Sequence, residues 1–471
     1  MDFGSDSFLY DDEVLNSVSR YEEMLKSKTR SFFDVHEFED IIDYYLDSRN
    51  LSKAAIAADH ANSIYPTASS IKLRMAEILI DTSQPAKALS LLNKVGYLES
   101  DEYAVYLMRG AALNMMGKPR EAQRQFEIAI SMADENKVAV LYNIGMSFES
   151  INQYRVALKY FMKVHMMEPE NFYVFYDLAF CYERLDELDK SIEYYLKFLK
   201  EDPFSEHVWY NLGIVYNKKE DNEKALEAYD YAIAVAPNYS SAYFNKANTL
   251  SLLDQNSEAI ETYKDFLEIE PDNAAAYCYI GECYERMEEL EMAQIHYNKA
   301  LKLDNNFADA WFGLGVIKSQ NGDHKVAIKN LLKALNLCED NPDYLFALAT
   351  AYSNINQYEK ATAVFEKLTQ MITDDIYIWD CFAQIYAKQG DFEHARKIIN
   401  EALKKNPDEA VLHYRLAAYY LLDHKDFIGL SVLEEALIEF PEESECFFEV
   451  IDITNDDDEI NYLMDKYSDK R

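Results

Sequence analysis

The chain has 471 residues, of which 84 are acidic and 46 basic, so its formal net charge is −38 at pH 7. Hydrophobic residues make up 49% of the chain, which is too high a share for a disordered protein, yet no apolar run approaches the roughly 18 residues of a membrane span. An acidic surface repels nucleic acid and anionic lipid, so we expect neither nucleic-acid binding nor membrane insertion. The charge either keeps a long helical chain soluble or attracts a basic partner.

The first 34 residues form an acidic segment with a predicted capping helix. Its apolar stripe consists of Val14, Val18, Tyr21 and Leu25. The opening residues lack the basic stretch and apolar core of a signal peptide, and six cysteines are scattered through the chain as in reduced proteins. We therefore expect a cytoplasmic protein. Asp34 and Glu37 have the spacing of a capping box and open the first repeat.

From residue 35 onward, two small-residue positions recur about every 34 residues. One of them opens the second helix of each predicted hairpin: Ala54, Ala88, Ala122, Ala157, Ser191, Ala225, Ala259, Ala293, Ala327, Ala361, Ala395 and Gly429. The other lies in the first helix: Ala76, Gly110, Gly145, Ala179, Gly213, Ala247, Gly281, Gly315, Ala349, Ala383 and Ala417, with Ile42 in the first repeat. Small side chains at both positions allow two helices to approach closely.

This period predicts twelve helical hairpins with short connections. Their ranges are 35–68, 69–102, 103–137, 138–171, 172–205, 206–239, 240–273, 274–307, 308–341, 342–375, 376–409 and 410–443. Residues 444–471 are predicted to form a partial repeat that caps the array, with an inward stripe of Ile460, Leu463, Met464 and Tyr467. The prolines agree with these boundaries. Pro85 and Pro119 lie in first turns, and Pro342 begins a repeat.

The segment Glu206–Tyr239 shows the motif most completely. Trp209, Leu212, Gly213 and Tyr216 share one helical face, and a second helix carries Ala225, Tyr229 and Ala232 before Pro237. With these residues the chain resembles the tetratricopeptide repeat (TPR) family. The resemblance implies an all-α fold, an α/α superhelical solenoid of about twelve tetratricopeptide hairpins with N- and C-terminal capping helices. It also implies a concave groove lined by the first helices, where partner proteins bind.

No motif indicates catalysis or a bound cofactor. Gly110, Gly117 and Lys118 resemble a phosphate loop only faintly, because the spacing is too long and Pro119 replaces the required Ser or Thr. Cys278 and Cys283 are not spaced as a zinc knuckle. We therefore predict that the chain is not an enzyme and has no cofactor, no metal site and no catalytic residues.

The second, fifth, ninth and twelfth positions of each first helix are predicted to face the groove. The candidate peptide-binding residues are Tyr142, Met146, Tyr173, Tyr176, Phe180, Tyr210, Asn211, Ile214, Phe244, Asn245 and Asn248. Apolar and aromatic side chains there suit an extended or helical segment of another protein, and the asparagines suit its backbone. The alternative is that these aromatics are part of the scaffold. A lysine-based carboxylate clamp, as in chaperone-binding members of the family, is disfavoured because Phe244 stands where the lysine would be, four residues before Asn248.

The sequence thus predicts a non-catalytic scaffold or adaptor that binds peptide segments of partner proteins in the groove. The alternative is a substrate-selecting or regulatory subunit of a separate enzyme, such as a transferase complex. In either case we expect a protein or peptide partner that is basic or carries apolar or aromatic anchors. The sequence does not define an oligomeric state.

Overall fold

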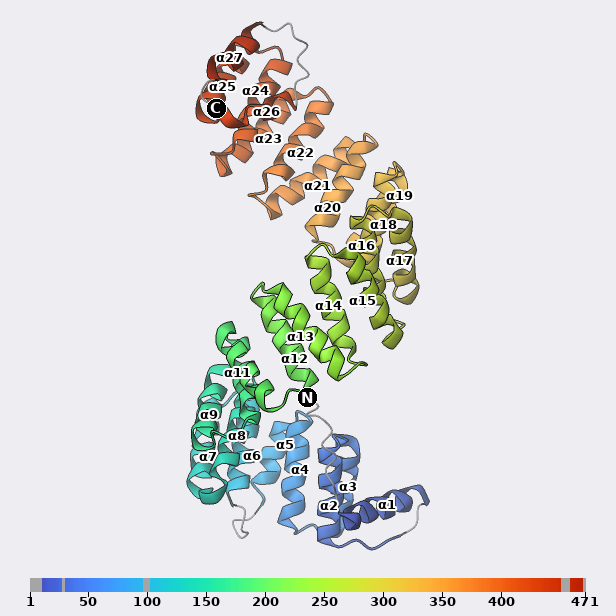
Figure 1. Cartoon of the computed structure of the whole chain (residues 1–471), viewed down its shortest axis with the longest axis vertical. Helices are drawn as coiled ribbons and strands as arrows, with labels where there is room; N and C mark the ends of the chain where they lie inside the picture. Colours follow the sequence, from blue (N-terminus) through green and yellow to red (C-terminus); the bar gives the residue numbers. More distant parts are fainter. Residues whose placement is uncertain (1–10, 28–29, 96–101, 450–457, 469–471) are drawn as a thin grey trace. The chain divides into compact units, whose positions relative to one another are not determined.

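A computed structural model describes residues 11–27, 30–95, 102–449 and 458–468 (Figure 1). Every regular element in these ranges is a helix, which confirms the predicted all-α fold. The chain divides into two compact units, Met1–Thr249 and Leu250–Arg471. Parts of the two predicted caps, residues 1–10, 28–29, 450–457 and 469–471, lie outside the described residues, as do residues 96–101.

In the first unit a leading helix precedes alternating first and second helices. The leading helix is α1 (Asp12–Ser27), and a short 3₁₀ turn is η1 (Asp134–Asn136). The first helices are α2 (Val35–Asp47), α4 (Ser69–Asp81), α6 (Glu102–Met115), α8 (Lys137–Glu149), α10 (Tyr173–Arg184), α12 (Glu206–Lys218) and α14 (Ser240–Leu252), which ends beyond the boundary. The second helices are α3 (Leu51–Ile64), α5 (Pro85–Leu92), α7 (Pro119–Met132), α9 (Tyr154–Met167), α11 (Leu188–Glu201) and α13 (Asn222–Val235).

The second unit continues the same alternation. Its second helices are α15 (Asn256–Ile269), α17 (Leu290–Leu303), α19 (His324–Leu337), α21 (Tyr358–Met371), α23 (Phe392–Lys405) and α25 (Asp426–Glu439). Its first helices are α16 (Ala274–Arg286), α18 (Ala308–Gln320), α20 (Pro342–Asn354), α22 (Ile376–Lys388) and α24 (Ala410–Leu422). Three short elements follow: η2 (Pro441–Glu443), α26 (Glu445–Phe448) and α27 (Asp458–Ser468).

A left-handed backbone residue ends the first helix of each hairpin. In the hairpin of α12 and α13 it is Glu220, with φ of 62°, and the next amide, of Asp221, donates to the carbonyl of Tyr216 at 2.9 Å. This six-to-one bond is the Schellman motif, which satisfies a carbonyl at the helix end. The other hairpins turn at residues with the same sign of φ: Arg49, Ser83, Gly117, Asn152, Asp186, Asp254, Glu288, Gly322, Asn356, Gly390 and His424. A single geometry therefore closes all the hairpins, although most of these residues are not glycine.

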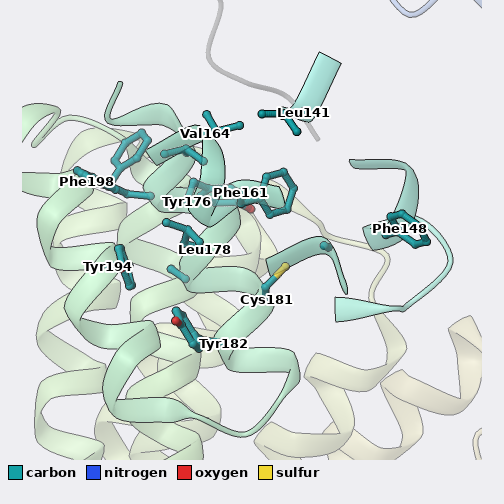
Figure 2. Close-up of a cluster of buried hydrophobic side chains, with 14 of the residues drawn as sticks. Leu141, Phe148, Phe161, Val164, Tyr176, Leu178, Cys181, Tyr182, Tyr194 and Phe198 are labelled. Carbon is teal, nitrogen blue, oxygen red and sulfur yellow. The ribbon is translucent and has the colours of Figure 1, made fainter. Parts of the chain in front are cut away.

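The helices pack in two layers within each unit. Within a unit a second helix contacts its own first helix and the first helix of the next hairpin, as α9 does with α8 and α10. Successive first helices also touch, for example α4 with α2 and α6. Between the layers the buried side chains form a succession of hydrophobic clusters, and one of them runs from Leu113 to Ala228. Figure 2 shows part of it, including Phe161 of α9, Leu178 of α10 and Phe198 of α11. Each hairpin thus buries its apolar face against its neighbour, as stacked repeats require.

The described part of each cap agrees with the sequence, with one correction. The capping box is present, because the Glu37 amide donates to Asp34 Oδ1 at 2.9 Å and the Asp34 amide donates to Glu37 Oε2 at 2.9 Å. Val18 and Tyr21 of α1 are buried as predicted, but Leu25 is 46% exposed and Met24 is buried in its place. The prediction for Leu25 was therefore wrong, because the buried stripe of α1 ends one residue earlier. In α27, Ile460 and Tyr467 are buried and pack against α24 and α25.

The small residue of the first helix lies against a ring of the second helix. A Cβ atom added to Gly213 would lie 2.5 Å from Cε1 of Tyr229, whose side chain is fully buried. Gly145 faces Phe161 and Gly281 faces Tyr297 in the same way. Real Cβ atoms do not approach other atoms so closely, so glycine lets the two helices come into contact.

We predict that Gly213→Val lowers the free energy of unfolding by about 1–3 kcal/mol, because the added methyl groups overpack the contact with Tyr229. Gly213→Ala should cost less, since Ala179 holds the same position in the preceding hairpin. Urea unfolding followed by circular dichroism measures both variants. Equal stability of Gly213→Val and the parent would contradict the close contact.

Candidate protein-binding surface

The predicted binding residues all lie on first helices of the first unit. Tyr142 and Met146 are on α8, and Asn211 and Ile214 are on α12; the others are Tyr173, Tyr176 and Phe180 on α10, Tyr210 on α12, and Phe244, Asn245 and Asn248 on α14. Their exposure differs. Tyr173 is 54% exposed, Tyr176 is buried with 9% exposed, and the rest are partly buried. The structure therefore brings the residues onto adjacent helices but does not leave all of them open to a partner.

Tyr176 belongs to the core between the two helix layers. Figure 2 shows it in the same buried cluster as Phe161 and Phe198. Its ring packs edge-on against Tyr195, with the centroids 5.9 Å apart. Burial raises the pKa of Tyr176 to about 12, so its hydroxyl keeps its proton at neutral pH. Tyr176 therefore contributes to the packing of α10 on α11.

Two of the candidate asparagines link neighbouring first helices. Asn211 Nδ2 donates to Tyr176 Oη at 3.0 Å, and Asn245 Nδ2 donates to Tyr210 Oη at 3.0 Å. Both pairs join residues 35 apart in sequence. We call such a polar contact between residues i and i+35 a rung. In both of these rungs a fifth-position residue meets the sixth-position residue of the next first helix.

Rungs also occur where the residues are charged. Arg415 of α24 donates to the carboxylate of Asp380 of α22 from Nε at 2.9 Å and from Nη2 at 3.0 Å. Arg74 Nη1 of α4 lies 3.9 Å from Glu39 Oε1 of α2. Sequence reasoning missed these links because it aligned equal repeat positions, which are 34 residues apart. The signal in the sequence is a pair of complementary side chains, of which the second stands one position later in its repeat than the first.

The ninth position of successive first helices carries apolar side chains that remain partly exposed. They are Met146 on α8, Phe180 on α10 and Ile214 on α12. Tyr142 is also partly exposed and lies one turn before Met146 on the same face of α8. These four residues, which we call the ninth-position patch, form an apolar part of the predicted site that is open to another molecule, as is Tyr173, which is 54% exposed.

Two carboxyl groups lie beside this patch. Asp177 of α10 is 2% exposed and Glu149 of α8 is 9% exposed. Burial raises the pKa of Asp177 to about 8, and the charge of Glu149 adds to the shift. Burial likewise raises the pKa of Glu149 to about 7. A hydrogen bond with the hydroxyl of Tyr142 opposes the shift at Asp177, while Asp177 Oδ2 has no hydrogen-bond partner.

A metal site and a membrane span both require features that the described residues lack. No group of three or more His, Cys, Asp or Glu side chains in this part of the chain is placed to hold a metal ion. No helix in the same residues is long and apolar enough to cross a bilayer. Burial raises the pKa of Cys181 and of Cys278, so both thiols stay protonated. A protonated thiol is a poor nucleophile.

Paired helices at a fixed spacing, closed by one turn geometry, define a helical-hairpin repeat protein. Models described as Tetratricopeptide repeat match residues 138–171, 173–205, 208–239, 228–261, 274–307, 308–341, 342–375 and 378–419. The chain therefore belongs to the tetratricopeptide repeat family. The presence of these repeats supports a role of the chain as a protein-interaction scaffold. The division into twelve repeats stays a prediction, as does the assignment of individual residues to a binding site.

Several solved structures resemble the chain. The MamA protein is 25% identical over 37% of this chain and 95% of its own, with a TM-score of 0.35. A chain of the APC/C hetero-tetramer Cut9–Hcn1 is 14% identical over 86% of this chain and 93% of its own, with a TM-score of 0.42. YrrB, described as a TPR protein with an unusual peptide-binding site, is 22% identical over 40% of this chain and 96% of its own, with a TM-score of 0.35. Among curated proteins, no match to the chain was found.

We predict that Arg415→Met destabilises the second unit by about 3–5 kcal/mol, because it leaves the buried Asp380 without its cation. The side chains of Arg415 and Asp380 are 6% and 8% exposed. The double variant Arg415→Met, Asp380→Leu should recover most of the lost stability, since neither residue of the pair then leaves a buried charge. Urea unfolding measures the three proteins. A double variant no more stable than the single one would show that the rung is not the cause.

The raised pKa values of Asp177 and Glu149 predict that stability falls as pH rises from about 4 to about 8. Between these limits the folded protein binds more protons at the two carboxyls than the unfolded chain does, so raising the pH favours unfolding. The urea midpoint should therefore be higher at pH 6 than at pH 8. Asp177→Asn with Glu149→Gln should flatten this slope. An unchanged slope in the double variant would place the titration elsewhere.

Proposed function

We propose that the chain is a non-catalytic scaffold that binds peptide segments of partner proteins along its first helices. The observation that carries the proposal is the ninth-position patch. Met146, Phe180 and Ile214 recur 34 residues apart on successive first helices, and all three stay partly exposed. Apolar contacts at a regular spacing suit an extended or helical segment laid across several helices.

The patch narrows the set of residues assigned to binding. Tyr176, Asn211 and Asn245 use their polar atoms in rungs between first helices, so we assign them to the scaffold. Tyr142, Met146, Phe180 and Ile214 are assigned to the partner. Phe244 and Asn248 on α14 would extend the same surface. All six cysteines are free, which suits a reducing compartment, and we place the protein in the cytoplasm.

We predict that Met146→Ala with Phe180→Ala weakens binding of selected peptides at least roughly tenfold, because each buried apolar anchor contributes about 1–2 kcal/mol or more. The peptides are obtained by phage selection on the immobilised full chain, and affinity is measured by fluorescence anisotropy. The matched control is Phe204→Ala, which removes a ring that is 77% exposed in the loop after α11.

Circular dichroism and thermal unfolding should be the same for the parent, the double variant and the control. If the double variant binds the peptides as tightly as the parent, the ninth-position patch is not the binding surface. If Phe204→Ala has the same effect as the double variant, the loss is not specific to the patch.

A further inference from the structure

Four acidic side chains are buried among the residues that the structure describes: Glu149, Asp177, Glu183 and Asp380. Two of them have a cation from the next first helix. Arg415 pairs with Asp380, and Lys218 pairs with Glu183. In the described part of the chain, no lysine, arginine or histidine pairs with Glu149 or Asp177. A buried carboxylate is costly unless a positive charge or a proton accompanies it.

The residue in place to neutralise Glu149 has another partner. Arg184 lies 35 residues after Glu149, which is the spacing of a rung, but its Nε donates to Tyr154 Oη at 3.3 Å. Asp177 Oδ2 has no hydrogen-bond partner although the side chain is 2% exposed. The two carboxyls therefore form an acidic site with unused acceptor capacity and no internal cation.

We propose that Glu149 and Asp177 receive the positive side chain of a lysine or arginine in the bound segment. The inference rests on the proposed function and names the chemistry of the partner, which is a basic residue next to apolar ones. The chain itself, with a net charge of −38, favours the approach of such a segment. An acidic or phosphorylated segment would meet like charge at the same place.

The ninth-position patch shares helix faces with the two carboxyls. On α8, Tyr142, Met146 and Glu149 are spaced by four and three residues and share one face. On α10, Asp177 and Phe180 are three residues apart and also share one helix face. The methylene groups of a lysine can pack on Met146 and Phe180 while its ammonium group reaches the carboxyls. Met146 is unbranched, so its side chain adapts readily to an inserted stem.

Proton binding competes with the cation at this site. Burial raises the pKa of both carboxyls, so they hold protons near neutral pH, and a cation that binds there displaces them. Binding of a basic segment should therefore tighten as pH rises from 6 to 8. The other titratable groups around the pair are Tyr142 on α8, Tyr176, Cys181 and Glu183 on α10, Tyr195 on α11, and Lys218 on α12, which pairs with Glu183.

The test uses the full chain and two libraries of short peptides that differ only at one fixed central position. That position is lysine in one library and norleucine, which keeps the stem without the charge, in the other. The remaining positions are randomised over Ala, Leu, Ser and Tyr. Retention is measured at pH 6 and pH 8 for the parent, Asp177→Asn, Glu149→Gln and the control Glu77→Gln. Glu77 lies on another first helix, α4, and burial also raises its pKa.

We expect the parent to retain the lysine library at least roughly tenfold better than the norleucine library at pH 8, and less well at pH 6, because only lysine brings a positive charge to the buried carboxyls. The preference should disappear in Asp177→Asn and in Glu149→Gln and persist in Glu77→Gln. Equal retention of both libraries by the parent overturns the inference and leaves the proposed function standing. A lysine preference that survives in both carboxyl variants also overturns it. If neither library is retained, the proposed function and the inference both fail.

Because a carboxyl variant that fails to fold gives no information on binding, the parent supplies a second measurement. Its lysine preference must increase between pH 6 and pH 8 as the carboxyls lose their protons. A preference that is the same at both pH values overturns the inference without reference to any variant.

Discussion

The close contact between a small residue in each first helix and a ring or aliphatic side chain in the second helix is the constraint on which the repeats depend. Gly213 illustrates it, because there is no room for a Cβ atom between its backbone and Tyr229. Two helices that approach so closely leave an apolar face uncovered on each side of the hairpin. Only the next hairpin can cover that face, so the chain stacks instead of folding back on itself.

Two periods run through this stack, and they serve different purposes. Apolar and small residues recur every 34 residues and set the packing between the layers. Polar rungs join residues 35 apart, as Asn211 with Tyr176 and Arg415 with Asp380, and connect successive first helices directly. A hydrogen bond or ion pair forms in one register only, whereas apolar packing tolerates small shifts. The rungs therefore specify how one first helix lies against the next.

The fold can be predicted from this sequence to a large extent, because the small residues repeat with little variation. Helix type, hairpin connections and the capping box of Asp34 and Glu37 all follow from local spacing. The left-handed turn residue cannot be found in this way, since glycine occupies it in only a few hairpins and residues as different as Glu220 and His424 occupy it in others. Local spacing also misplaced one residue of α1, where Met24 is buried instead of Leu25.

The binding surface is less predictable, for a physical reason. A repeat position indicates which helix face a side chain occupies but not how deeply the neighbouring hairpin covers it. Tyr142 and Tyr176 hold the same position in adjacent repeats, yet Tyr142 is partly exposed and Tyr176 is buried. The difference arises from contacts between hairpins, which involve Tyr195 and Asn211 in the case of Tyr176. No single repeat contains that information.

The acidic character of the chain has two physical origins that composition alone does not separate. Most carboxylates lie in water, where their mutual repulsion is screened and their main effect is on solubility. A few lie in the layer of first helices, where low polarity makes each charge depend on a specific neighbour. Asp380 meets this requirement with Arg415 from the same chain, whereas Asp177 has only the hydroxyl of Tyr142 and a second acid, Glu149. Since a stable fold does not keep a lone buried charge, Asp177 carries a proton in the free protein, and the surface beside it is less negative than the formal charge suggests.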